Sequence, residues 1–121
     1  MFNIMVVEDD RKLAALMCAV LKKNGYTPIS VSDGEAAIEL LSHEHVDLII
    51  SDIMMPNMDG YQATLAIRGL PDKEKAGIPI VAMTANAFAE DRQKAFNVGM
   101  NGHIAKPINT EILRETLREL L

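Results

Sequence analysis

The sequence predicts an α/β domain in which a doubly wound, parallel β-sheet is covered by helices on both faces. Three observations lead to this prediction. Apolar runs of strand length alternate with segments of helical periodicity, and this unit recurs five times along the chain. The length of 121 residues suits one domain, residues 1–121, with enough buried surface to fold without disulfides. Hydrophobic (49%) and charged (24%) residues occur in ordinary globular proportions, which excludes disordered and fibrous classes.

The predicted strands are five short apolar runs. They are Ile4 to Val7, Ile29 to Val31, Asp47 to Asp52, Pro79 to Thr84 and His103 to Ala105. A helical segment separates each strand from the next. A parallel crossover of this kind places its helix against the sheet, so the sheet is expected to be buried on both faces.

Capping residues and apolar spacing locate three of the helices. The first helix is expected from about Arg11, with Gly25 as the left-handed residue that ends it. The second is expected from about Asp33, because Ser32 and Glu35 have the spacing of a capping box. The last should begin after Asn109 as its N-cap. The apolar residues expected to face the core are Leu13, Leu16, Met17, Val20 and Leu21 in the first helix and Leu113, Leu117, Leu120 and Leu121 in the last.

Charge and cysteine content bound the classes of partner. The net charge is −5 and the pI is near 5.1, and no window gathers the basic residues that binding to a phosphate backbone requires. We therefore expect no direct contact with DNA or RNA. Cys18 is the only cysteine and no signal-peptide pattern opens the chain, which favours the cytoplasm. No apolar run approaches the ~18 residues that a membrane span needs.

Polar residues follow the predicted strands at one edge of the sheet. Glu8, Asp9 and Asp10 come after the first strand, and Asp52 ends the third. Thr84 ends the fourth strand and Lys106 follows the fifth. Ligands of an open α/β sheet bind beyond the carboxyl ends of its strands, so these side chains are expected to converge.

Converging carboxylates need a cation. Two unit charges about 4 Å apart interact by roughly 4 kcal/mol at a protein-like dielectric of about 20, and like charges at that energy destabilise the fold. The oxygen donors and the lack of nearby cysteine or histidine pairs favour Mg²⁺. With metal and lysine present, one aspartate could take a phosphoryl group as an acyl phosphate.

Four segments together resemble the signatures of the receiver domains of two-component response regulators. They are Met5-Val6-Val7-Glu8-Asp9-Asp10, Ser51-Asp52-Ile53-Met54-Met55-Pro56-Asn57-Met58-Asp59-Gly60, Thr84-Ala85 and Lys106-Pro107. The resemblance covers nearly the whole chain. It implies a flavodoxin-like (βα)5 fold with strand order 2-1-3-4-5, and a cis Lys106-Pro107 bond.

The resemblance also implies a role for each matching residue. Asp52 would be the phosphoacceptor. Glu8 and Asp9 would hold Mg²⁺ together with Asp52 and the backbone carbonyl of Met54. Thr84 would hydrogen-bond a phosphoryl oxygen, and Lys106 would pair with the phosphoryl group or with the carboxylate of Asp52. Asp10 would instead cap the first helix.

The family comparison further implies a signalling function and no enzyme activity. The phosphoryl group would come from a histidine kinase or a histidine phosphotransfer protein. The conformational switch would lie on the face of the fourth helix, the fifth strand and the fifth helix. The chain would be a monomer or weak dimer. His103 stands where many members have Tyr or Phe, so the usual aromatic switch is not assumed.

Two enzymatic or cofactor-binding alternatives use the same fold. A Mg²⁺-dependent phosphohydrolase with an aspartate nucleophile would place a second aspartate two residues after Asp52, where this chain has Met54. A flavin-binding module would need a Ser/Thr-rich phosphate loop after the first strand, where Glu8 and Asp9 would repel phosphate. The pair His43 and His45 lacks a third metal ligand in the sequence and is interpreted as part of a solvated loop.

The two halves of the chain resemble different kinds of receiver. Residues 1 to about 60 resemble those of DNA-binding response regulators. Residues 78–87 and 99–107 resemble those fused to hybrid histidine kinases. This difference suggests a natural recombinant or an engineered chimera, with the junction near Met58-Asp59-Gly60.

Overall fold

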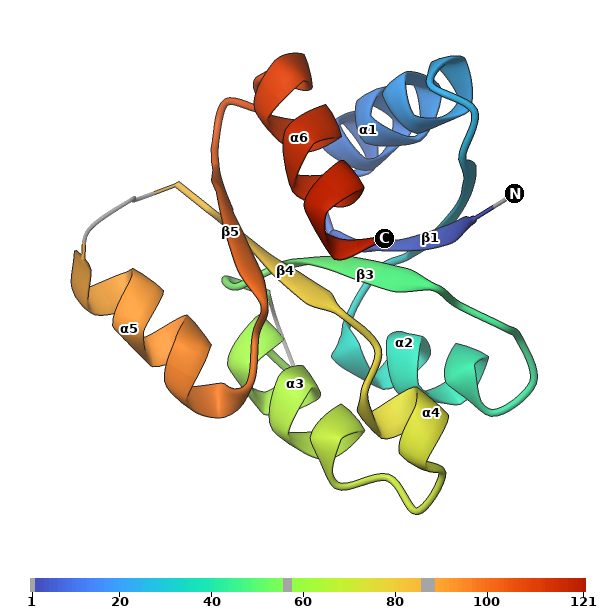
Figure 1. The fold of residues 1–121 in the computed structure, drawn as a ribbon, viewed down its shortest axis with the longest axis vertical. Coiled ribbons are helices and arrows are strands. Elements are labelled where there is room, and N and C mark those ends of the chain that lie inside the picture. The colour runs from blue at the N-terminus through green and yellow to red at the C-terminus, as the bar shows by residue number, and fades with distance from the viewer. Residues whose placement is uncertain (1, 56–57, 86–88) are drawn as a thin grey trace.

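The computed structural model describes residues 2–55, 58–85 and 89–121. Five parallel strands form one sheet in the order β2-β1-β3-β4-β5 (Figure 1). The predicted α/β fold and strand order are therefore confirmed. The elements are β1 (Asn3–Val7), α1 (Arg11–Lys23), β2 (Thr27–Val31), α2 (Gly34–Leu41), β3 (Leu48–Asp52), α3 (Gly60–Arg68), α4 (Lys73–Ala76), β4 (Ile80–Thr84), α5 (Ala89–Val98), β5 (Gly102–Ala105) and α6 (Thr110–Leu120).

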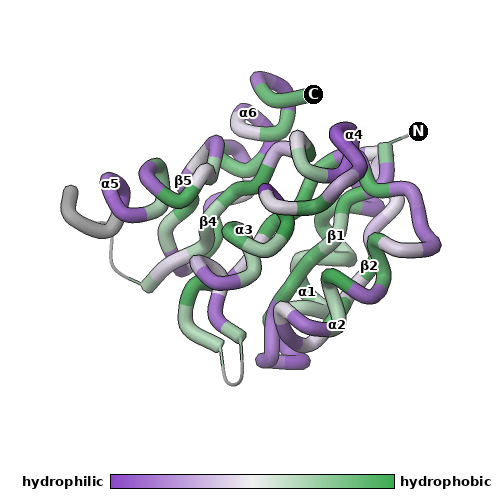
Figure 2. The backbone as a smooth tube through the Cα atoms, turned by 90° about the horizontal axis from the view of Figure 1, so that it is seen from below, coloured by the Kyte–Doolittle hydropathy of each residue, from purple (hydrophilic) through white to green (hydrophobic). Residues whose placement is uncertain are grey.

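The sheet separates two apolar clusters. Helices α1 and α6 cover one face, and α2, α3 and α5 cover the other (Figure 1). Alternate residues of β1 point to opposite faces, so Ile4 and Val6 enter the first cluster while Met5 and Val7 enter the second. The central strands β3 and β4 are buried along their whole length. Figure 2 accordingly shows β1 and β4 mainly in the green of apolar residues.

Side-chain caps begin the helices. The carboxylate of Asp10 accepts hydrogen bonds from the N–H groups of Lys12 and Leu13, which confirms Asp10 as the cap of α1. Asn109 caps α6 as predicted. At α2 the prediction was wrong by one residue, because the cap is Asp33 rather than Ser32.

Leu16 and Leu121 depart from the predicted core. Leu16 is 58% exposed and Leu121 36% exposed, although both have the spacing of a buried helical face. A stripe of apolar residues on α1 is wider than the strip that the sheet can cover, so the residue at its margin remains outside. In α6 only Leu113 and Leu117 are fully buried.

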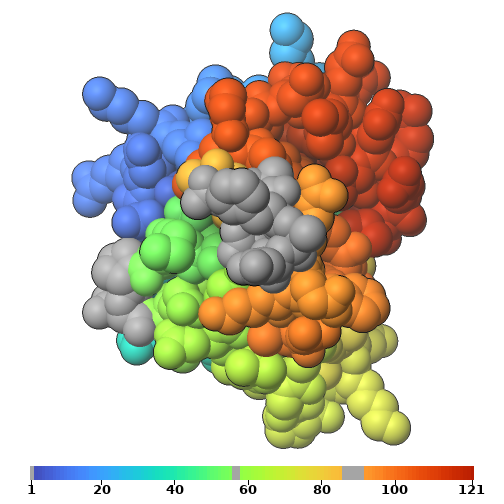
Figure 3. Space-filling view, turned by 90° about the vertical axis from the view of Figure 1, so that its left-hand side faces the viewer, coloured from blue at the N-terminus to red at the C-terminus, as the bar shows by residue number. Residues whose placement is uncertain are grey.

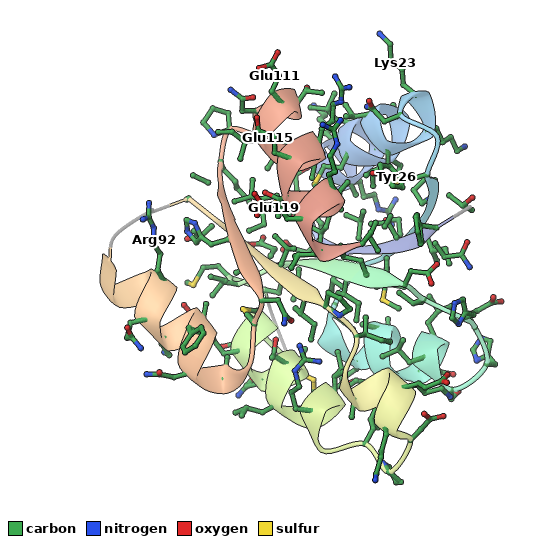
Figure 4. All side chains as sticks on the ribbon, viewed as in Figure 1. Lys23, Tyr26, Arg92, Glu111, Glu115 and Glu119 are labelled. Carbon is green, nitrogen blue, oxygen red and sulfur yellow. The ribbon has the colours of Figure 1, made fainter. Side chains whose placement is uncertain are left out.

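The outer side of α6 is highly charged. Glu111, Glu115 and Glu119 follow one another along the helix at intervals of one turn (Figure 4).

An additional short helix, α4, lies between α3 and β4. The face predicted to carry the conformational switch therefore corresponds to α5, β5 and α6. No helix in the described part of the chain has the length and apolarity to cross a bilayer.

One arginine joins the amino-terminal ends of β4 and β5 to α3. Arg68 ends α3, and its guanidinium donates to the carbonyl oxygens of Gly99 (2.7 Å), Ala76 (2.6 Å) and Ile78 (2.8 Å). It also donates to the side-chain oxygen of Asn101 at 2.7 Å. Burial removes water from the guanidinium and lowers the pKa of Arg68 from its usual value. These bonds fix the edge of the sheet opposite the strand ends described next.

Candidate functional site

The strand ends bring the predicted site residues to one edge of the molecule. Glu8 follows β1, Asp52 ends β3, Thr84 ends β4 and Lys106 follows β5. The register places Asp52 opposite Met83, one residue before Thr84, so these ends lie at nearly one level. Figure 3 views this edge, where α1 (blue), the residues after β3 (green) and the carboxyl-terminal elements (orange and red) border one another.

Glu8, Asp9 and Asp52 form an acidic cluster. Each offers a carboxylate oxygen, and these three atoms all lie within 4.8 Å of one another. Glu8 and Asp52 are only 3% and 4% exposed, whereas Asp9 is exposed to solvent. A groove of about 540 Å³ opens beside Glu8 and Asp9, between α1 and the end of β2. Hard oxygen donors with an open side fit a Mg²⁺ ion that keeps part of its water shell.

Lys106 lies against the buried members of the cluster. Its Nζ is 3.1 Å from Oδ2 of Asp52 and 3.5 Å from Oε2 of Glu8. Burial lowers the pKa of Lys106, but the hydrogen bond and negative charge of Asp52, together with Glu8, outweigh burial and raise it overall. Lys106 is therefore a fixed positive charge in the site. Its peptide bond to Pro107 is cis, as the resemblance implied.

The carboxyl group of Glu8 holds its proton unusually strongly. Burial raises its pKa from 4.5 to about 7. The N–H of Asp10 donates to Oε1 at 3.1 Å and lowers the pKa, while Asp52 raises it and Lys106 lowers it. The pKa of Glu8 is raised overall because its carboxylate is buried beside that of Asp52, and the single positive charge of Lys106 is shared between the two. A divalent cation at the cluster would favour the ionised form of Glu8.

The carboxylate of Asp52 has different partners on its two oxygens. Oδ2 faces Lys106, and Oδ1 accepts a hydrogen bond from the backbone N–H of Met54 at 3.2 Å. The side chain of Met54 is 79% exposed and extends away from the core. Thr84 is buried at the end of β4, and its carbonyl oxygen accepts from the N–H of Lys106 at 2.7 Å.

Several other residues considered from the sequence lie away from this cluster. The side chain of Asp10 caps α1. His45 is paired with Asp47 at 2.8 Å, and His43 contacts Ser42, so neither joins a group of three metal ligands within the described ranges. His103 lies on β5 and is half-buried.

The structure also assigns positions that sequence patterns did not single out. Ser51 is buried, and its hydroxyl donates to the carbonyl oxygen of Asp52 at 3.1 Å. Gly60, which starts α3, lies close to that same carbonyl. The sequence signal for Gly60 was present in the motif that follows Asp52, but the motif alone does not reveal which backbone atoms the glycine approaches.

At one edge of the parallel sheet, acidic side chains from two central strands lie against a lysine. This arrangement is typical of the class of α/β signalling domains that the sequence motifs indicated. The sequence model of the response regulator receiver domain matches residues 4–118, so this chain belongs to the response regulator receiver domain family.

Sensor kinases of bacteria contain similar sequences. The sensor histidine kinase RcsC of Escherichia coli K12 is 37% identical over 114 residues, which cover 94% of this chain and 12% of the kinase. The sensor protein EvgS of the same strain is 34% identical over 118 residues, covering 98% of this chain and 10% of EvgS. The chain thus spans about a tenth of the length of these relatives. The family match continues through residues 58–60, and the junction predicted there stays a prediction.

Solved structures show the same fold. The chemotaxis protein CheY4 of Vibrio cholerae has a TM-score of 0.92 and 30% identity, with 100% of this chain and 99% of that chain covered. The receiver domain of the sensor histidine kinase PA1611 of Pseudomonas aeruginosa PAO1 has a TM-score of 0.88 and 34% identity, covering 98% and 96% of the two chains. A magnesium ion is coordinated in the active site cleft of the PA1611 domain.

Proposed function

We propose that this receiver domain accepts a phosphoryl group on Asp52 in a two-component phosphorelay. The observation that carries the proposal is that the buried carboxylate of Asp52 contacts a lysine and also belongs to an acidic cluster. Lys106 Nζ is 3.1 Å from Oδ2 of Asp52, and Glu8 and Asp9 offer further metal-binding oxygens within 4.8 Å. A buried carboxylate in such a setting can act as a nucleophile once cations neutralise the incoming phosphoryl oxygens.

Glu8, Asp9 and Asp52, with the backbone carbonyl of Met54, would hold Mg²⁺. The fit is supported by the three oxygens within 4.8 Å of one another and by the pKa of Glu8, which burial and the neighbouring Asp52 raise. When bound, Mg²⁺ neutralises charge on the phosphoryl oxygens and on the cluster.

In the transfer, a carboxylate oxygen of Asp52 forms a bond to phosphorus as the phosphorus–nitrogen bond of a phosphohistidine donor breaks. The electron pair of the broken bond stays on the donor imidazole. Lys106 pairs with the phosphoryl group as it arrives, and the hydroxyl of Thr84 donates to a phosphoryl oxygen. Both residues come from neighbouring strands joined by the Lys106–Thr84 backbone bond.

The donor is a histidine kinase or a histidine phosphotransfer protein in this proposal, supported by the sensor kinases among the relatives. The switch acts on the face of α5, β5 and α6, which adjoins Thr84 and Lys106. We also propose a monomer or weak dimer that acts in the cytoplasm without direct contact with nucleic acid. The acidic net charge of −5 supports that last point.

A phosphohydrolase is the less favoured function. Its second aspartate would stand at Met54, whose side chain cannot donate or accept a catalytic proton. The chain belongs to a family of signalling domains. In the proposed transfer it accepts the phosphoryl group and is not an enzyme that turns over a substrate.

Intact mass after incubation with acetyl phosphate and MgCl₂ tests the proposal. The wild-type protein should gain one phosphoryl group, and EDTA should prevent the gain. Asp52→Asn should gain none. Asp10→Asn is the matched control, because it changes a neighbouring carboxylate that caps α1 and faces away from the cluster. Equal uptake by Asp52→Asn would contradict the assignment.

A further inference from the structure

The backbone that carries Asp52 is in close contact with the start of α3. A Cβ atom on Gly60 would lie 2.6 Å from the carbonyl oxygen of Asp52 and 3.0 Å from Cα of Ile53. Atoms at the first distance overlap strongly, and both neighbours are main-chain atoms that no rotamer change can move aside. Any residue other than glycine at position 60 must therefore displace α3 or the backbone of Asp52 and Ile53.

Hydrogen bonds hold this backbone from several sides. The N–H of Gly60 donates to the carbonyl oxygen of Ile53 at 3.0 Å, and the N–H of Ile53 donates to Met83 on β4 at 3.1 Å. The hydroxyl of Ser51 donates to the carbonyl oxygen of Asp52 at 3.1 Å. The two peptide groups that follow Asp52 are thus held between β4 and the first turn of α3.

The first turn of α3 has little freedom to move away. Asp59 and Gln62 form a reciprocal capping box, and the hydroxyl of Thr64 donates to the carbonyl oxygen of Gly60 at 2.7 Å. Thr64 and Ala63 are buried. Added volume at Gly60 would therefore be transmitted largely to the Asp52 side.

We infer that Gly60 is a positioning residue for phosphoryl transfer, because its bare Cα lets α3 approach and orient the backbone of Asp52. This inference rests on the proposed function of Asp52. The orientation matters twice, since Asp52 supplies the nucleophilic oxygen and the next residues lead to Met54, whose N–H holds Oδ1. A misplacement of about 1 Å at a reacting group can slow a reaction by as much as a hundredfold.

Gly34 offers a matched control at the start of α2. Like Gly60, it is the first residue of a helix and is buried. A Cβ there would lie 2.9 Å from Cβ of Ala63 and 2.9 Å from Cγ of Met58. The crowding is milder than at Gly60 and falls on side chains, without an atom of Asp52 or Ile53 among the nearest neighbours. Gly34→Ala should therefore destabilise the fold without turning the phosphoacceptor.

The experiment compares wild type, Gly60→Ala and Gly34→Ala with acetyl phosphate at saturating Mg²⁺. Urea unfolding gives the folded fraction of each protein, and intact mass gives the initial rate of phosphorylation per folded molecule. Gly60→Ala should be slower by at least about tenfold on this normalised scale. Gly34→Ala should stay within about twofold of wild type. A purely structural role would leave the normalised rate of Gly60→Ala unchanged, and that result would overturn the inference.

Ser51→Ala keeps the test decisive if Gly60→Ala does not fold. It releases the same carbonyl oxygen of Asp52 without adding an atom, so phosphorylation per folded molecule should slow by several-fold. An unchanged rate in Ser51→Ala, with Gly60→Ala unfolded, would refute positioning through this carbonyl. Failure of wild type to take phosphate on Asp52 would instead refute the proposed function, which separates the two ideas.

Discussion

The backbone N–H of Lys106 donates to the carbonyl oxygen of Thr84 over 2.7 Å, so the lysine after β5 is tied to the residue that ends β4. The bond joins adjacent strands beyond the last paired residues of their register, Thr84 and Ala105. The side chain of Lys106 is thereby directed at the carboxylates of Asp52 and Glu8 rather than left to sample solvent. Its charge should contribute measurably to folding.

Lys106→Met should lower the free energy of unfolding by about 2 kcal/mol in metal-free buffer, because two buried carboxylates lose their cation. Urea denaturation at neutral pH in EDTA measures the change. Lys12→Met, an exposed lysine on α1, is the matched control and should stay within about 0.5 kcal/mol of wild type. Equal losses in the two variants would show that the ion pairs do not stabilise the fold.

The contribution of Glu8 to the stability of the metal-free protein should fall as pH rises from about 4.5 to 7. The folded protein keeps the Glu8 proton up to a pKa of about 7, while the unfolded chain releases it near 4.5. The folded state therefore binds more protons in this window, and raising pH favours unfolding. The stability of wild type relative to Glu8→Gln should fall by up to about 3 kcal/mol across the window and level off above it, because Gln does not titrate. A difference that is flat with pH would contradict the raised pKa.

Mg²⁺ should raise the melting temperature because it binds the folded cluster and relieves repulsion there. At a hundred times the dissociation constant the gain is about 2.7 kcal/mol. Asp9→Asn should be more stable than wild type in EDTA and should respond less to Mg²⁺. Asp10→Asn retains a side-chain cap on α1 and should respond like wild type. Identical metal-induced shifts in Asp9→Asn and wild type would argue against the proposed ligands.

Loss of the phosphoryl group from Asp52 should be slow, because the apolar side chain of Met54 offers no group to orient an attacking water. That side chain is 79% exposed, so it can be replaced without disturbing the core. Met54→Asn should change the decay rate after donor removal, while Met54→Leu should preserve it. Matching decay in all three proteins at saturating Mg²⁺ would mean that Met54 does not control access of water.

Arg68→Lys should destabilise the fold by about 2–4 kcal/mol, since an ammonium cannot reach all the acceptors that the guanidinium contacts. Urea unfolding measures the loss. The exposed Arg114 on α6 provides the comparison, and Arg114→Lys should be nearly neutral. A small effect at position 68 would show that the carbonyl groups find other partners.

The five strands could be predicted from the apolar pattern of the sequence, and their order from the resemblance to receiver domains. Apolar runs of strand length that are joined by helices have few ways to pack, and β3 and β4 are buried throughout. The convergence of Glu8, Asp52 and Lys106 follows from topology, because each lies at or just after the carboxyl end of a strand. Their roles in phosphoryl transfer stay predictions.

Other features depend on distances that a linear pattern does not contain. Leu16 has the period of a core residue yet lies at the margin of the covered strip. Ser32 and Asp33 are both good caps, and only the backbone geometry selects Asp33. Gly60 and Arg68 act through main-chain atoms that are distant in sequence. No local sequence pattern shows that a Cβ atom at position 60 would lie 2.6 Å from the carbonyl oxygen of Asp52.

The partners of Arg68 are mostly backbone oxygens, which has a consequence for sequence drift. Every residue type has a carbonyl group, so substitutions at Ala76 or Ile78 that keep the local backbone leave the acceptors in place. Asn101 is the exception, because its side-chain oxygen accepts from Arg68 and also from the N–H of Ile80. Position 76 should therefore tolerate many residues and position 78 other apolar residues, since Ile78 is also buried in the core, whereas 68 and 101 should change only together. Related receivers can therefore vary along this edge of the sheet while the contacts of Arg68 with the backbone are kept.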